Sequence, residues 1–132
     1  MHPELNDETR GMIGEPQLRR MKRTAFLINT ARGKVVQQSA LVRALTERWI
    51  AGAALDVYED EPPGPGNPLY QCDNLIMSPH IAGLTEESVY GMSLSAAKQI
   101  LQALSGKRPP HIVNPEAWEA ALARAKSLNF QM

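Results

Sequence analysis

The stretch Ala25-Phe-Leu-Ile-Asn-Thr-Ala-Arg-Gly33 decides the predicted fold. Its apolar run, Ala25 to Asn29, is short and leads directly into a polar turn, which is typical of a buried strand in a parallel sheet. Gly33 lets the backbone turn sharply after the strand, so the side chain of Arg32 is expected to point into the crevice at the strand end. The stretch therefore predicts a strand that carries a cation to the edge where open parallel sheets bind ligands.

Strand and helix patterns alternate on both sides of this stretch. Apolar spacing of three and four residues indicates helices, and short apolar runs between proline- and glycine-rich segments indicate strands. The predicted order is a short helix over 15–21, the strand over 25–29, a helix capped by Ser39 and ending near Arg48, a strand over 52–57, a loop over 59–67 and a strand over 74–78.

A long helix and a shorter one follow. Thr85 is a suitable cap for the long helix, and Gly106 is a suitable stop. A second helix is expected from Pro115 to about residue 126, since proline is favoured in the first turn. The apolar stripe expected to be buried on the long helix is Val89, Met92, Ala96, Ile100 and Leu104. Together the elements predict an α/β fold: an open, doubly wound parallel sheet of about three strands, with flanking helices and a C-terminal helix.

Composition narrows the class of protein. The chain has 132 residues, of which 43% are hydrophobic, and it carries 14 basic and 14 acidic residues. A neutral chain offers no bulk field to attract nucleic acid or an anionic membrane, so neither is an expected partner. The basic group Arg19, Arg20, Lys22 and Arg23 is interpreted as a solvated helix end rather than a phosphate contact.

Cellular location is predicted from what the sequence lacks. Cys72 is the single cysteine, so no intrachain disulfide can form. The amino terminus has no signal pattern, and no apolar stretch approaches the roughly 20 residues needed to span a bilayer. The expected location is the reducing cytoplasm.

Three side chains of complementary chemistry end three consecutive strand segments. Arg32 follows the first, Glu61 lies in the loop after the second, and His80 follows the third. A cation, an acid and a proton carrier are what the reduction of a 2-oxo acid requires. Each also has a plainer interpretation: a surface arginine, one of several solvated loop acids, and a hydrogen-bonded core histidine.

Two further predictions come from the places of Asp56 and of the histidines in the sequence. Asp56 ends the second strand, where its carboxylate can accept hydrogen bonds from a ligand amide or cap nearby backbone amides, and its position favours the ligand. A metal site is not expected, because the three histidines are scattered without ligand spacing. They are His2, His80 and His111.

The strand-end motifs closely resemble the D-isomer-specific 2-hydroxyacid dehydrogenases, the family of phosphoglycerate dehydrogenase, D-lactate dehydrogenase, and glyoxylate or hydroxypyruvate reductase. The matching motifs are Asn29-Thr-Ala-Arg-Gly33, Ala54-Leu-Asp-Val-Tyr58 with Glu61-Pro62, and Ser78-Pro-His-Ile-Ala-Gly83. The segments 6–14 and 113–115 are also similar to that family, so the resemblance runs from about residue 4 to residue 118.

The resemblance implies a function for each motif. Arg32 would bind the carboxylate of a small 2-hydroxy or 2-oxo acid and polarise the 2-oxo group, and His80 would donate the proton. Glu61 would pair with His80, because a carboxylate beside the ring favours the imidazolium. The cofactor would be NAD, with NADP not excluded. Its nicotinamide end would be lined by Thr30, Ala31, Arg32, Asp56, His80 and Gly83.

The glycine-rich phosphate turn of this family is missing, since G-x-G-x-x-G occurs nowhere in the sequence. By resemblance, residues 1–113 would be the C-terminal half of a Rossmann-type NAD-binding domain and 114–132 a helical tail. NAD would then bind only weakly. Half of a parallel sheet would also expose an unpaired strand edge and an apolar face, which a second copy or a separately made N-terminal half would cover. The alternative is a non-catalytic assembly or dimerisation module built on the long helix.

Overall fold

The computed structural model describes residues 1–127 and divides the chain into two compact units. The first unit is Met1–Gly83, and the second begins at Leu84. The strand-end motifs all lie in the first unit. The expected division at residues 113 and 114 concerns the domain of a complete protein and stays a prediction.

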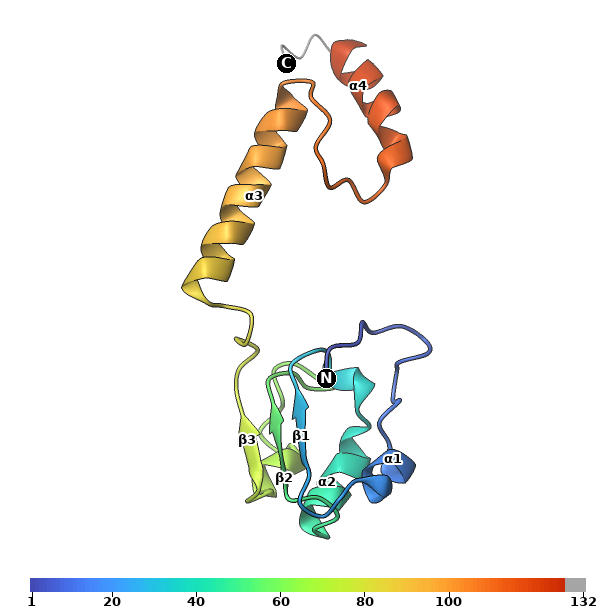
Figure 1. Cartoon of the computed structure of the whole chain (residues 1–132), viewed down its shortest axis with the longest axis vertical. Helices are drawn as coiled ribbons and strands as arrows, with labels where there is room; N and C mark the ends of the chain where they lie inside the picture. The colour runs from blue at the N-terminus through green and yellow to red at the C-terminus, as the bar shows by residue number, and fades with distance from the viewer. Residues whose placement is uncertain (128–132) are drawn as a thin grey trace. The chain divides into compact units, whose positions relative to one another are not determined.

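The first unit is built on a parallel sheet of three strands in the order β1-β2-β3 (Figure 1). The strands are β1 (Phe26–Asn29), β2 (Gly52–Leu55) and β3 (Leu75–Met77). Ala54 of β2 lies opposite Ile28 on one side and Ile76 on the other. A parallel sheet with flanking helices confirms the predicted α/β class. Because the strands are parallel, their carboxyl ends share one edge, and the three motifs lie on that side of the sheet.

Two helices cover one face of this sheet: α1 (Glu15–Arg20) and α2 (Gln38–Thr46) (Figure 1). The prediction that Ser39 caps α2 is wrong, since the cap residue is Gln37 and Ser39 lies in the first turn. The carboxylate of Glu59 accepts a hydrogen bond from the Gln38 N–H at 2.9 Å. A side chain from a distant loop therefore satisfies an amide that a local cap would otherwise serve.

The core lies between the helices and the sheet. Its largest fully buried side chains include Leu18 of α1, Leu41 and Leu45 of α2, and Ile50 and Leu69 from the connections. On the opposite face, Phe26, Ile28 and Ile76 are 68%, 55% and 73% exposed. The predicted buried strand β1 is therefore buried on one face of the sheet only, because α1 and α2 pack on that face.

The second unit contains α3 (Glu86–Leu104) and α4 (Trp118–Ser127), preceded by the 3₁₀ turn η3 (Pro115–Ala117). The predicted ends of α3 are confirmed: the Thr85 hydroxyl accepts from the Ser88 N–H at 3.1 Å, and Gly106 has a φ of 69° beyond the last turn. The predicted burial of its stripe is wrong, since no residue of α3 is buried. Amphipathic spacing identifies an apolar face, but burial needs a second surface.

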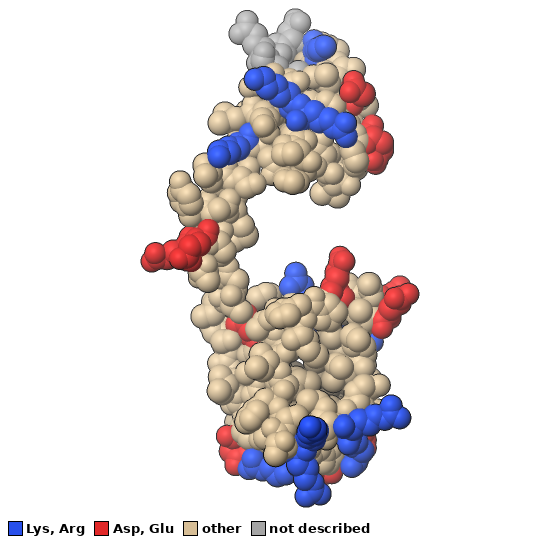
Figure 2. Space-filling view, in the orientation of Figure 1, with Lys and Arg blue, Asp and Glu red and all other residues tan. Residues whose placement is uncertain are grey.

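Charge is distributed unevenly over the first unit. Figure 2 shows Lys and Arg side chains gathered at the end of this unit opposite the carboxyl edge of the sheet. The predicted basic group begins in the last turn of α1, where Arg19 pairs with Glu15 at 2.8 Å and lies over the Trp49 ring. All four of its side chains are exposed, as predicted for a solvated helix end. Within residues 1–127, no helix is both long and apolar enough to cross a membrane.

Candidate active site

The side chains of His80 and Glu61 form a hydrogen bond at the carboxyl edge of the sheet. Nδ1 of His80 lies 2.8 Å from Oε2 of Glu61, and the two side chains are 49% and 37% exposed. An ionised carboxylate can only accept hydrogen bonds, so Nδ1 must carry the proton in this pair. The other ring nitrogen, Nε2, is then the one that a ligand can use.

The Glu61 carboxylate is held from a second side by the backbone. The Tyr58 N–H donates to Oε1 of Glu61 at 2.9 Å. This bond, and then the His80 ring and the positive charge of Arg32, lower the pKa of Glu61. Glu61 is therefore ionised at neutral pH and is placed to stabilise a positive charge on the ring.

Arg32 is positioned by a turn that Asn29 closes. The buried Asn29 side chain accepts from the Ala31 N–H and donates to the Arg32 carbonyl, each at 3.0 Å. The Arg32 guanidinium donates to the Ala31 carbonyl at 2.7 Å and is otherwise exposed. The turn thus presents a cation at the strand end, near enough to Glu61 to lower its pKa.

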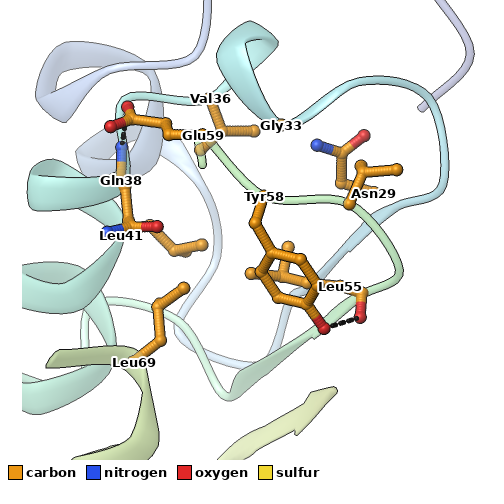
Figure 3. A pocket seen from close by; sticks show the side chains of 10 residues that line it. Asn29, Gly33, Val36, Gln38, Leu41, Leu55, Tyr58, Glu59 and Leu69 are labelled. Atoms are coloured by element: carbon orange, nitrogen blue, oxygen red, sulfur yellow. Dashed lines mark hydrogen bonds between the residues drawn. The ribbon is translucent and has the colours of Figure 1, made fainter. Parts of the chain in front are cut away.

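Gly33 allows the ends of β1 and β2 to approach closely. A methyl group at this position would overlap the carbonyl of Tyr58. Figure 3 shows this region, where Gly33, Tyr58 and Glu59 are among the residues that line a small pocket of about 10 Å³. Glycine at this point brings the backbone that carries Arg32 against the backbone that leads to Glu61.

Asp56 is a buried carboxylate, 3% exposed, beneath the histidine turn. Its Oδ1 accepts from the Ser78 hydroxyl at 2.6 Å and the Ile81 N–H at 2.9 Å, and its Oδ2 accepts from the Ala82 N–H at 2.9 Å. The Ser78 hydroxyl, followed by the two amides, lowers the pKa of Asp56. The carboxylate therefore has the amide-capping contacts of the plainer interpretation, and three of its roughly four acceptor positions are used.

A hollow of about 360 Å³ opens beside Arg32. Three of the predicted cofactor residues, Thr30, Ala31 and Arg32, line it together with the segment His2-Pro-Glu-Leu5. Sequence reasoning missed this segment, because no local motif marks it. The pairing of Ile13 with Val36, which draws the amino-terminal region against the β1 connection, depends on the fold.

The last predicted cofactor residue, Gly83, ends the first unit. A Cβ atom at this position would have no heavy atom within 4 Å. Sequence reasoning did not identify Tyr58, Ser78 and Asn29, whose polar atoms hold the turns. Among residues 1–127, no three His, Cys, Asp or Glu side chains gather in a way that would hold a metal ion.

Comparison with known proteins gives a consistent family. The family model described as D-isomer specific 2-hydroxyacid dehydrogenase, NAD binding domain, matches residues 1–82. The glyoxylate reductase of Thermofilum pendens is 52% identical over 116 residues, which are 88% of this chain and 34% of that protein. The glyoxylate reductase of Korarchaeum cryptofilum is 50% identical over 116 residues, 88% of this chain and 35% of that protein. The chain spans about a third of the length of these curated relatives.

Solved structures that resemble this chain belong to the same family. The NAD-complexed D-isomer-specific 2-hydroxyacid dehydrogenase of Lactobacillus delbrueckii ssp. bulgaricus is 36% identical with a TM-score of 0.77, covering 85% of this chain and 38% of that one. The NADPH complex of a D-isomer-specific 2-hydroxyacid dehydrogenase from Xanthobacter autotrophicus Py2 is 34% identical with a TM-score of 0.71, covering 89% and 48%. The predicted Rossmann-type fold and a family that uses NAD or NADP are confirmed. The chain belongs to the family of D-isomer-specific 2-hydroxyacid dehydrogenases, and residues 1–82 match its NAD-binding domain.

Proposed function

We propose that this chain supplies the proton-donating side of an enzyme that interconverts a 2-oxo acid and a D-2-hydroxy acid with NAD or NADP. The observation that carries the proposal is the contact between His80 and Glu61 at the carboxyl edge of a parallel sheet. A histidine whose Nδ1 is fixed by a carboxylate presents Nε2 as a proton donor and acceptor of defined position. The names of the relatives make glyoxylate the first substrate to test.

The roles follow from the chemistry of each group. In reduction, the protonated His80 gives its proton to the substrate carbonyl oxygen, which becomes the hydroxyl of the product. The planar Arg32 guanidinium binds the substrate carboxylate and polarises the neighbouring carbonyl. Glu61 stabilises the positive ring before the transfer. In oxidation, the neutral His80 ring takes the hydroxyl proton back.

The residues present fit the nicotinamide end of the cofactor, which supplies or accepts the hydride. Thr30 and Ala31 line the hollow beside Arg32, and the side chain of His80 is exposed at the same edge of the sheet. The one acceptor position left on Asp56 is the proposed contact for the carboxamide. The residues present do not provide a pyrophosphate site of this kind, because the sequence contains no G-x-G-x-x-G turn. We infer that the chain alone binds NAD weakly and turns over only with a polypeptide that supplies this turn and a substrate domain.

A chimera tests this function. The chain would replace the 116 residues that it matches in the Thermofilum pendens glyoxylate reductase, and NADH oxidation would be followed with glyoxylate and with larger 2-oxo acids. Turnover by the chimera, with none by the chain alone, is the expected result. A folded chimera without turnover would refute the proposal, since the parent enzyme is the positive control.

One observation favours the alternative of an assembly module. The 19-residue helix α3 has no buried residue, and Val89, Met92 and Ile100 are all exposed. Apolar side chains in such a stripe favour association. Light scattering of the chain distinguishes the two functions: a stable dimer in a chain whose chimera is inactive supports the assembly module, and an active chimera supports the enzyme.

A further inference from the structure

His80 has a backbone conformation that needs an explanation. Its φ is 56°, in the left-handed region that residues with a Cβ rarely occupy. Such a conformation persists only where the surrounding contacts hold it, and it often marks a functional site. The groups that hold this turn therefore determine where the imidazole points.

The holding contacts come from one buried side chain. Both oxygens of Asp56 accept hydrogen bonds from the segment 78–82: Oδ1 from the Ser78 hydroxyl and the Ile81 N–H, and Oδ2 from the Ala82 N–H. These donors flank His80 on both sides in the chain. Three hydrogen bonds to one ionised acceptor are charge-assisted and thus stronger than neutral ones.

Tyr58 holds the same segment and also binds Glu61. The Tyr58 hydroxyl donates to the Ser78 carbonyl at 2.7 Å, while the Tyr58 N–H donates to Glu61. Ser78 is thereby held through its hydroxyl by Asp56 and through its carbonyl by Tyr58. The histidine turn and the carboxylate that faces it are thus connected through the end of β2.

We propose that Asp56 is a positioning residue, whose carboxylate holds the turn Ser78–Ala82 in the conformation that brings Nδ1 of His80 to Glu61. This inference rests on the proposed function for its catalytic meaning and adds a role for Asp56 beyond contact with the cofactor. The positioning itself requires neither cofactor nor substrate. It is therefore testable in the 132-residue chain even if the chain proves to have another activity.

The experiment is nuclear magnetic resonance of the ¹⁵N-labelled chain and of Asp56→Asn. Asparagine keeps the size of the side chain but loses one acceptor and the charge. The matched control is Asp73→Asn, which removes the same charge from a side chain that is 77% exposed and pairs with Arg48. Ser78→Ala is a milder variant that removes a single donor to Asp56.

Two signals report on the turn. In the parent chain and in Asp73→Asn, neutral His80 should be the Nδ1–H tautomer, and the amides of Ile81 and Ala82 should be protected from hydrogen exchange. In Asp56→Asn, these two amides should exchange about tenfold faster or more, and His80 should shift toward the Nε2–H tautomer. His111, in the second unit, is the internal reference for the tautomer. Ser78→Ala should change both signals in the same direction by a smaller amount.

The result that would overturn the proposal is an unchanged tautomer and unchanged amide protection in an Asp56→Asn chain whose sheet amides remain protected. If Asp56→Asn does not fold, Ser78→Ala decides, and an unchanged His80 tautomer in that variant overturns the proposal equally. Turnover by the chimera is a separate result. An altered turn in an inactive protein would refute the enzymatic function alone.

Discussion

The side chains of His80 and Glu61 are in contact, with 2.8 Å between Nδ1 and Oε2, although 19 positions separate them in the chain. Neither residue stands out by itself, since both side chains are partly exposed and lie in connections between regular elements. The parallel register of β2 and β3 brings the two loops to one edge, and the N–H of Tyr58 fixes the carboxylate there. The contact thus follows from the fold.

Glu61→Gln should impair proton donation while preserving shape. The amide remains able to hydrogen-bond but carries no charge to stabilise the imidazolium, so kcat/KM for the 2-oxo acid should fall by roughly 10²-fold. The measurement is steady-state NADH oxidation by the chimera. Asp60→Asn, which neutralises the neighbouring loop acid, is the control and should leave kcat/KM unchanged.

Gly33→Ala should destabilise the first unit. The added methyl group would overlap the Tyr58 carbonyl, which cannot move without displacing the end of β2. We expect a loss of about 3 kcal/mol in the free energy of unfolding. Urea unfolding followed by Trp49 fluorescence, in a Trp118→Phe background, gives this value.

Gly64→Ala is the matched control for that substitution. A Cβ atom at Gly64 would have no heavy atom within 4 Å, and its φ is not positive. The free energy of unfolding should therefore change by no more than about 0.5 kcal/mol. Equal effects at the two glycines would contradict the close approach of β1 and β2 described for Gly33.

Acid should destabilise the first unit through Asp56 and Glu61. The pKa of each is lowered in the folded chain from its ordinary value, 3.8 for Asp56 and 4.5 for Glu61, so the unfolded chain binds protons more tightly. Stability is then fully present above these ordinary values and is lost as pH falls through the lower folded pKa values. Urea midpoints between pH 6 and pH 3 measure the effect.

Variants of Asp56 and Glu61 show whether these carboxylates cause the pH dependence of stability. Asp56→Asn and Glu61→Gln should each make the urea midpoint less dependent on pH below about 4.5. Glu15, whose pKa is lowered chiefly by its hydrogen bond with Arg19, contributes in the same direction and stays in both variants. A pH dependence equal to that of the parent chain in both variants would show that other carboxylates are responsible.

Cys72 should react slowly as a thiol. Burial raises the pKa of Cys72, so the reactive thiolate is scarcer than for a free cysteine at pH 8. Alkylation by iodoacetamide should be slower in the folded chain than in the same chain in urea. Equal rates in the two states would mean that the environment of η2 (Pro68–Gln71), which precedes Cys72, does not protect the thiol.

The sequence predicts elements whose signals are local. The apolar run before Arg32, the cap at Thr85 and the stop at Gly106 each lie within a few residues of what they determine, and all three features are present. The cap of α2 depends instead on Glu59, which is 21 positions from Gln38. Local propensity cannot reveal such a partner.

The candidate site likewise contains features that the local sequence predicts and contacts that depend on distant residues. The ends of the strands predict that Arg32, Glu61 and His80 share an edge, because parallel topology alone requires this. The backbone amides that Asp56 binds lie 25 and 26 positions later in the chain, so the sequence alone does not show that they occupy acceptor positions of this carboxylate. The sequence also predicts a buried stripe on α3 that the structure does not have. The spacing of apolar residues identifies one face of a helix but not a second surface that would cover it.

The most direct test of the central claim is the rate of the chimera with His80→Asn. Asparagine preserves polarity but cannot donate the proton as a cation, so kcat for 2-oxo acid reduction should fall by about 10²- to 10⁴-fold. That loss, in a folded protein, is the result that our account predicts. A His80→Asn chimera that reduces glyoxylate at the parent rate would contradict it.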